Sequence, residues 1–225
     1  SHDLFLYNRQ EGNSRGEQTR NFSLLHVWMI SSVPVLLFTD CLAQTANRRF
    51  PFTAFWITKK SEVQQKQGAA STFLRDTLFR ICTVFGMDTQ DYFIALSKSF
   101  MISADNAHAV HPNHTDKADP VNRPYLNEGI VIKYNANQKY CTDGISAAMF
   151  KDICKQIDVP YQTFTNRSDM AGGSTLGNIS NTQVALNTVD IGLPQLAMHS
   201  PYETAGVKDT EYLLKAAKAF FCIDH

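Results

Sequence analysis

Hydrophobic positions recur at helical spacing in two consecutive stretches in the first half of the chain. The first begins at residue 69 and stops at Gly86, a residue type common just after a helix C-terminus. The second is predicted from a cap at Asp88 or Thr89 to about Phe100. An apolar run at residues 101–104 follows, typical of a buried strand that ends at Asp105. The apolar face of the first helix consists of Phe73, Leu74, Leu78, Ile81, Cys82 and Phe85.

The alternation of strands and helices continues towards the C-terminus. The predicted strands are residues 129–134, residues 159–165 and a strand within 189–198, with a further candidate at residues 4–7. The predicted helices are residues 144–157, with Ile145, Met149, Ile153 and Ile157 at helical spacing, and residues 209–221. This order predicts an α/β fold with a layered sheet, in which functional sites gather at the strand ends.

Residues 17–67 do not follow this pattern. They contain a patchy apolar block, then the run Arg-Arg-Phe-Pro-Phe, then a strongly charged and polar run, and neither period is sustained. No linker rich in Gly, Ser or Pro separates them from the rest. We therefore expect a single domain over residues 1–225 that contains one unusual internal segment.

Composition narrows the class of protein. The 21 Lys and Arg residues balance the 21 Asp and Glu residues, so there is no net positive charge to attract nucleic acid. The longest apolar run, residues 27–38, is interrupted by Ser31, Ser32 and Pro34 and falls short of the roughly 20 residues of a membrane span. The five cysteines are odd in number and form no CxxC pair, which argues against disulfides and thiolate zinc sites. No secretory signal is visible, and we expect a cytoplasmic protein.

Potential chemistry is concentrated in the loop after the 101–104 strand. This loop carries Asp105 and three imidazoles, His108, His111 and His114. An ordinary polar loop would explain them, and it is the commoner explanation on spacing alone. The alternative is a metal-binding or catalytic loop, because a carboxylate at the end of a strand is a hard ligand held on a rigid element.

Two other features near predicted strand ends can also be explained either as ordinary structure or as part of a functional site. His199 follows the apolar run 191–197, and a single histidine there is more often a hydrogen-bonded structural residue than a ligand. The glycine-rich segment 172–177 could bind an anion at a helix N-terminus. It matches neither the P-loop nor the GxGxxG pattern, so by itself it indicates only a turn.

These pieces become specific in combination and in order. The motifs are SADNAHAVHPN at 103–113, VIKYNANQKY at 131–140, NRSDMAGGSTLG at 166–177 and TVDIGLPQLAMHS at 188–200. Together they resemble the aspartyl aminopeptidase family of dinuclear zinc exopeptidases. The resemblance covers residues 1–11 and residues 67 to the end, and it implies a three-layer zinc-exopeptidase fold truncated at its N-terminus.

The resemblance also implies roles for particular residues. Asp105 and His199 match terminal zinc ligands on opposite sides of the metal pair. His108 matches a residue at the reacting end of the substrate, and Lys133 and Tyr140 match pocket residues. The ammonium of Lys133 would suit an acidic substrate side chain. In such a site two zinc ions hold and activate a water molecule that attacks the peptide.

Other parts of the family's site are missing from the sequence as written. A Leu-Asp-Asp motif should supply the bridging aspartate, and an Asp-Asn-Glu-Glu-Val-Gly motif should supply the general base. Both are expected between residues 11 and 67, and neither is there. No catalytic residue is therefore assigned. The family's oligomerisation domain is also absent from this sequence, which leaves open whether the chain forms the family's homo-oligomers.

The genetic code offers an explanation. Residues 28–30, Trp-Met-Ile, must be encoded TGG-ATG-ATH. Read from the preceding third base, these codons give Leu, Met or Val followed by Asp-Asp. The same frame over residues 55–62 requires Leu-Asp and then permits Asn-Glu-Glu-Val-Gly. We therefore hypothesise that residues 16–65 are frameshifted translation inside an aminopeptidase gene, and the alternative is a divergent insertion.

The sequence thus predicts a zinc aminopeptidase that releases N-terminal, acidic residues from peptides. With the base and bridging carboxylate displaced from the reading frame, a second hypothesis is a catalytically dead remnant that keeps a peptide- or amine-binding pocket around His108, Lys133 and Tyr140. Peptides are the expected partners under both hypotheses, and neither involves nucleic acid or a membrane.

Overall fold

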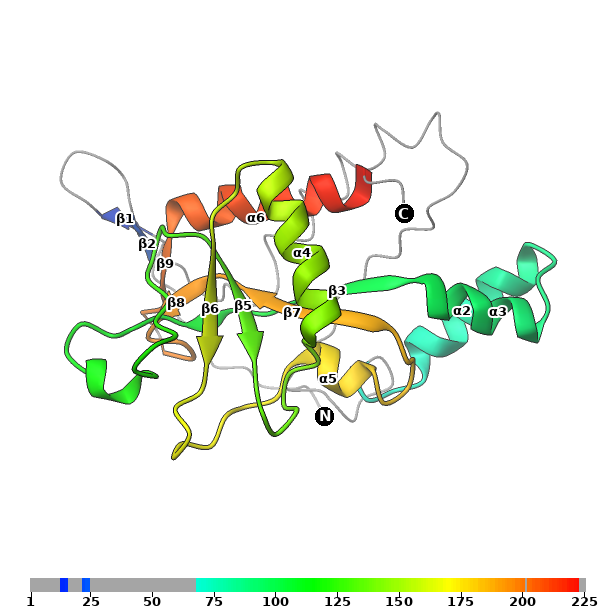
Figure 1. Cartoon of the computed structure of the whole chain (residues 1–225), viewed down its shortest axis with the longest axis horizontal. Coiled ribbons are helices and arrows are strands. Elements are labelled where there is room, and N and C mark those ends of the chain that lie inside the picture. The colour runs from blue at the N-terminus through cyan, green and yellow to red at the C-terminus, as the bar shows by residue number, and fades with distance from the viewer. Residues whose placement is uncertain (1–12, 16–21, 25–67, 201, 223–225) are drawn as a thin grey trace, which may run out of the picture.

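The computed structural model describes residues 13–15, 22–24, 68–200 and 202–222 (Figure 1). The strand predicted at residues 4–7 lies outside these residues, as does nearly all of the proposed frameshifted segment 16–65. None of the described helices combines the length and apolar character that crossing a bilayer requires.

A four-stranded mixed sheet forms the centre of the described fold. Its order is β3 (Phe100–Ala104), β7 (Asn187–Gly192), β5 (Ile130–Tyr134) and β6 (Tyr161–Thr165). β3 and β7 are parallel, β5 and β6 are parallel, and β5 is antiparallel to β7. The strands predicted in these regions are confirmed, with boundaries shifted by one or two residues.

Helices cover both faces of this sheet. α4 (Gly144–Gln156) and α6 (Val207–Cys222) pack together on the face that carries the hydrophobic core. The short helix α5 (Leu176–Ser180) contacts β3 and β7 from the opposite face, where the backbone N–H of Gly177 donates to Ser103 Oγ. The predicted α/β class is therefore confirmed. The core comprises Ile130, Ile132, Ala147, Phe150, Cys154, Val159, Val189, Ile191, Leu193, Leu213 and Ala216.

A second sheet continues from one end of the first. Its order is β1 (Asn13–Arg15), β2 (Phe22–Leu24), β9 (Thr204–Gly206), β8 (Pro194–Leu196) and β4 (Ala107–His108). β4 follows β3 and pairs in parallel with β8, which follows β7. The parallel ladder that starts at Phe100 therefore runs on through the loop that carries the candidate chemistry. A 3-10 helix, η3 (Thr115–Lys117), lies beyond β4.

The two predicted N-terminal helices are present as a hairpin, α2 (Phe73–Val84) and α3 (Thr89–Lys98). Gly86 follows α2 with φ of 74°, which favours glycine. Asp88 is the N-cap of α3, and its side chain accepts from the backbone N–H of Asp91 at 2.8 Å. The helix ends at Lys98 rather than near Phe100, because Ser99 is extended and Phe100 already begins β3.

In two helices, the apolar face predicted from the sequence is only partly buried in the structure. α2 has no buried residue, and Phe73, Phe79 and Phe85 are exposed. In α4, Ile145 and Met149 are 70% and 37% exposed. The buried face of α4 instead consists of Ser146, Ala147, Phe150, Ile153 and Cys154. α4 carries two overlapping apolar spacings, and the one that includes the bulky Phe150 contacts the sheet.

Asp209 fastens the first turn of α6 to the loop before β5. Its carboxylate is fully buried and accepts from the backbone N–H groups of Asn127, at 2.6 Å, and Gly129, at 3.0 Å. Asn127 Oδ1 in turn accepts from the backbone N–H of Lys208 at 3.0 Å. Burial raises the pKa of Asp209 to about 6, against the opposing effect of the two backbone donors.

The pH dependence of stability should report this buried carboxyl. Because burial raises the pKa of Asp209 to about 6 in the folded state, this carboxyl binds more protons in the folded than in the unfolded chain between about pH 4 and pH 6. Its contribution to the free energy of unfolding should therefore fall by about 3 kcal/mol as the pH rises through this window. Asp209→Asn should abolish that fall and, by leaving one backbone donor unsatisfied, destabilise the fold by about 1–3 kcal/mol. Urea unfolding at several pH values measures both effects.

The matched control is Asp152→Asn, on the exposed side of α4, where the carboxylate only accepts from Gln156 Nε2. This variant should keep the pH slope of the wild-type chain. A wild-type slope that survives Asp209→Asn would show that another group titrates.

Candidate functional site

Asp105 is held at the exit of β3 by the backbone of β7. Its N–H donates to the carbonyl oxygen of Ile191 at 3.0 Å, and the residue is 9% exposed. The approach of the two segments is close, because a Cβ added to Gly192 would lie 2.1 Å from the Asp105 carbonyl oxygen. Asp105 is therefore placed by a rigid ladder rather than by a free loop.

Lys133 reaches Asp105 from β5. It is 2% exposed, and its Nζ donates to the carbonyl oxygens of Asp105, at 2.7 Å, and Asn106, at 3.4 Å. The same ammonium lies 5.4 Å from the centroid of the Tyr140 ring, a cation–π geometry. The structure thus brings together three of the five residues predicted for the site.

Tyr140 is held as a neutral phenol beside these charges. Burial, followed by the negative charges of Asp105 and Asp190, raises its pKa to about 12. Its hydroxyl donates to Asn166 Oδ1 at 3.4 Å, and its ring lies 6.3 Å from that of Phe164. Tyr140 therefore links the motif at 131–140 to the motif that begins at Asn166.

The two predicted histidines lie further along the ladder. His108 is on β4, in register with Gln195 of β8, and is exposed. His199 lies in the turn between β8 and β9, is exposed and has φ of 68°. Its backbone N–H donates to Oε1 of the buried Glu203 at 2.6 Å. The ladder thus places the His199 turn beyond the level of Asp105.

The donors available for a metal ion are of suitable chemistry but too few. Carboxylate and imidazole both bind zinc. Across residues 68–200 and 202–222, however, no group of three or more His, Cys, Asp or Glu side chains could hold a metal ion. The described residues do not by themselves make a zinc site, and no chemical step can be derived through a metal from them.

Several polar residues at the site were not predicted from the sequence. Asp190 is fully buried in β7 and accepts hydrogen bonds from Cys141 and Thr175. Gln195 is also buried, and its Oε1 accepts from Asn106 Nδ2 at 3.0 Å. A carboxylate or amide inside an otherwise apolar run is the signal that could have identified both.

The glycine-rich segment 172–177 forms a turn that leads into α5. Thr175 caps the helix by accepting from the N–H of Asn178 at 3.4 Å. A Cβ on Gly172 would lie 1.7 Å from Asn166 Nδ2, and a Cβ on Gly177 would lie 2.6 Å from Ser103 Cβ. The glycines therefore allow close packing of this turn against the site.

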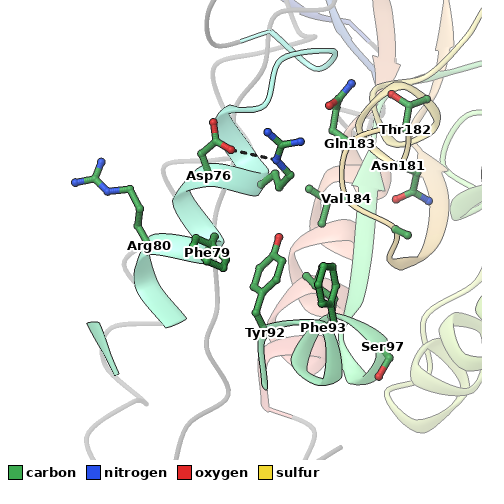
Figure 2. A pocket seen from close by; sticks show the side chains of 13 residues that line it. Asp76, Phe79, Arg80, Tyr92, Phe93, Ser97, Asn181, Thr182, Gln183 and Val184 are labelled. Atoms are coloured by element: carbon green, nitrogen blue, oxygen red, sulfur yellow. Dashed lines mark hydrogen bonds and ion pairs between the residues drawn. The ribbon is translucent and has the colours of Figure 1, made fainter. Parts of the chain in front are cut away.

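A cavity of about 710 Å³ lies elsewhere, between the α2–α3 hairpin and residues 181–185 (Figure 2). Figure 2 shows Tyr92 and Phe93 on one side and Val184 on the other, with Arg80 and Asp76 at the rim. None of the predicted site residues lines it. This cavity is therefore separate from the Asp105–Lys133–Tyr140 group.

Comparison with known proteins decides the family. The sequence model of the family described as aminopeptidase I zinc metalloprotease (M18) matches residues 56–221, well over half of the chain. The chain belongs to the M18 aminopeptidase family. The resemblance drawn from the four ordered motifs is confirmed.

Individual relatives support the same family assignment. A probable M18 family aminopeptidase 2 of Clostridium acetobutylicum is 54% identical over 156 residues, which is 69% of this chain and 36% of that protein. Its namesake in Clostridium novyi is 43% identical over 220 residues, 97% of this chain and 50% of that protein. A probable aspartyl aminopeptidase of Ricinus communis is 44% identical over 155 residues, 69% of this chain and 32% of that protein.

Solved structures agree with the fold. The structure of an Ape4 and Nbr1 complex matches with a TM-score of 0.79 and 33% identity, over 94% of this chain and 41% of that one. An M18 aminopeptidase from Thermotoga maritima matches with a TM-score of 0.75 and 21% identity, over 94% of this chain and 48% of that one. The chain spans about a third to a half of the length of these proteins.

Substitution of Gly192 tests how tightly Asp105 is placed. In Gly192→Ala the new methyl group would meet the Asp105 carbonyl oxygen at 2.1 Å and the Ala107 nitrogen at 3.0 Å, both backbone atoms that a rotamer change cannot relieve. We expect a loss of about 1–3 kcal/mol or more in the free energy of unfolding, measured in urea.

Gly173→Ala is the matched control, because no atom lies within 4 Å of the added Cβ. It should be close to neutral. If Gly192→Ala were as stable as Gly173→Ala, the strands would not be packed as closely as described.

Proposed function

We propose that this chain is part of the catalytic domain of a zinc aminopeptidase and carries two metal ligands and the substrate pocket. The observation that carries the proposal is the buried group of Asp105, Lys133 and Tyr140, in which a lysine ammonium lies 2.7 Å from the backbone oxygen of Asp105. Family membership supports the reaction class. The named relatives are aminopeptidases, and none of them favours a non-catalytic remnant.

The proposed metal ligands are Asp105 and His199. Each lies where a strand ends, Asp105 after β3 and His199 after β8. The description of the matching family names zinc, and two zinc ions are proposed. Bound zinc would polarise the scissile carbonyl and lower the pKa of a water molecule. The remaining metal ligands and the general base are proposed to be residues other than Asp105 and His199.

The proposed substrate is a peptide with an acidic N-terminal residue. Lys133 is a buried cation beside the proposed ligand Asp105, so a carboxylate that enters the pocket would gain an ion pair in a site of low polarity. The aromatic face of Tyr140 holds this ammonium from one side. His108 is proposed to contact the reacting end of the substrate. The name of the Ricinus communis relative, an aspartyl aminopeptidase, supports this preference.

Location and assembly are further parts of the proposal. Cys82, Cys141 and Cys154 are free thiols, which supports a reducing, cytoplasmic location. The solved structure of the Saccharomyces cerevisiae protein mApe1 is a dodecamer, and that assembly belongs to the yeast protein. A homo-oligomer is proposed for the family, whereas for this chain the oligomeric state stays open. Nucleic acid and membranes are not proposed as partners.

We also propose that residues 16–65 are translated from a shifted frame. The support is the codon arithmetic: a single alternative frame requires Asp-Asp at residues 28–30 and Leu-Asp at the start of residues 55–62, where it then permits Asn-Glu-Glu-Val-Gly. These motifs would add carboxylates to a part of the chain, residues 68–200 and 202–222, in which no group of three or more potential ligands could hold a metal ion. A divergent insertion would have no reason to encode both motifs in one frame.

Zinc binding by a matched pair of chains tests the function and the frame together. One chain has the unaltered sequence, and the other has residues 16–65 recoded in the shifted frame. The recoded chain should bind clearly more zinc per chain by elemental analysis after dialysis than the unaltered chain, because the recoded segment would add the bridging carboxylate and a further carboxylate ligand to Asp105 and His199. In the recoded chain, Asp105→Ala and His199→Ala should each lower the zinc content.

Asp152→Ala and His114→Ala, at exposed positions, are the controls and should retain the zinc of the recoded chain. The recoded chain should also release aspartate from an N-terminal aspartyl peptide faster than leucine from a leucyl peptide. Equal and negligible zinc in both chains would contradict the proposal.

A further inference from the structure

A buried carboxylate that no predicted role uses lies behind the proposed substrate pocket. Asp190 is in the middle of β7 and is 0% exposed. Its Oδ2 accepts three hydrogen bonds: from the backbone N–H of Cys141 at 2.6 Å, from the Cys141 thiol at 2.9 Å and from Thr175 Oγ1 at 2.9 Å. One oxygen atom therefore ties β7 to two separate loops.

The backbone of the same residue strengthens the connection. The N–H of Asp190 donates to Thr142 Oγ1 at 2.8 Å, and Thr142 Oγ1 donates to the Asp190 carbonyl oxygen at 3.4 Å. Residues 141 and 142 are thus both fixed to Asp190. Tyr140 precedes them directly, so the position of its ring depends on how this short segment is held.

The other carboxylate oxygen of Asp190 is not explained by these hydrogen bonds. Oδ1 is buried and has no hydrogen-bond partner among the described residues. An unpaired buried acceptor is costly and needs an explanation. The antiparallel register pairs Ile132 with Ile191, and its continuation places Lys133 opposite Asp190. The buried ammonium of Lys133 and the buried carboxyl group of Asp190 therefore lie on facing strands.

We propose that Asp190 is a positioning residue of the substrate pocket, which fixes the Cys141–Thr142 segment so that the Tyr140 ring covers the ammonium of Lys133. It acts through Tyr140 and Lys133 and does not contact substrate. Its consequence for substrate recognition rests on the proposed function, whereas its effect on the arrangement of Tyr140 and Lys133 does not.

The test is site-resolved chemical labelling of the chain with the unaltered sequence. Labelling rates are measured by peptide mass spectrometry, and the experiment needs neither bound metal nor enzymatic activity. In Asp190→Asn the Cys141 thiol loses a charged acceptor, and the Tyr140 ring is released from Lys133. Alkylation of Cys141 by iodoacetamide at pH 8.5 should become about tenfold faster, because the thiolate is no longer opposed by a neighbouring carboxylate. Acetylation of Lys133 by acetic anhydride should also rise several-fold.

Two internal references separate positioning from general loosening. Cys154 is buried in the core, and Lys151 lies over the rings of Tyr134 and Tyr161. Neither has a hydrogen bond to Asp190, so their labelling rates should stay within about twofold of wild type. Parallel increases at all four residues would show that Asp190 only stabilises the fold, and unchanged rates at Cys141 and Lys133 would equally overturn the proposal.

A second variant covers the case in which Asp190→Asn does not fold. The double variant Thr142→Val, Thr175→Val removes the three hydrogen bonds that these two side chains make with Asp190 and leaves the carboxylate in place. Lys133 labelling should still rise several-fold while Cys154 stays protected, and no rise would contradict the proposal.

Binding of L-aspartate to the zinc-loaded recoded chain, measured by calorimetry, then tests the consequence for recognition. Asp190→Asn should raise the Kd about tenfold. No binding by the parent chain would refute the acidic preference in the proposed function and leave the labelling result standing.

Discussion

The parallel pairing of β3 with β7 is the constraint on which the site depends. It begins at Phe100 with Asn187 and continues as β4 with β8, where Ala107 pairs with Pro194. Backbone bonds from the N–H groups of Asp105, Ala107 and Ala109 keep the two segments in register between and beyond the strands. Because a shift of one residue would turn every side chain to the other face, this register decides which polar groups meet.

The same register separates the core from the site. Val189 and Ile191 face α4 and α6 and belong to the hydrophobic core, whereas Asp190 between them faces the opposite side with Ser103. The alternation of side chains along a strand therefore gives an apolar face towards the core and a polar row towards the candidate site. Buried charges on that row are tolerated because each is engaged: Lys133 by two carbonyl oxygens and Asp190 by three donors.

Much of the fold could be predicted because local signals agree with the tertiary structure. Gly86, the Asp88 cap and the apolar runs at 101–104 and 129–134 mark boundaries that the structure reproduces within one or two residues. The buried face of α4 could not be predicted from spacing alone, because two apolar registers overlap on this helix and only packing selects one. The family followed from ordered motifs, not from periodicity.

The candidate site was predictable only in part. Lys133 and Tyr140 were expected as pocket residues together with His108, and Asp105 was expected as a metal ligand. The structure brings Asp105, Lys133 and Tyr140 together. Asp190 was missed because a single carboxylate within an apolar strand gives no local hint of which loops it will hold. Its partners, Cys141 and Thr175, are 49 and 15 residues away along the chain.

The proposed roles of Asp105 and His199 can be tested by a crystal structure of the recoded chain with zinc, using anomalous scattering at the zinc edge. If the two residues hold the same metal pair, zinc should lie about 2.0–2.2 Å from a carboxylate oxygen of Asp105 and about 2.0–2.1 Å from an imidazole nitrogen of His199. Zinc bound elsewhere, with either side chain turned away from it, would show that these two residues are not the metal ligands.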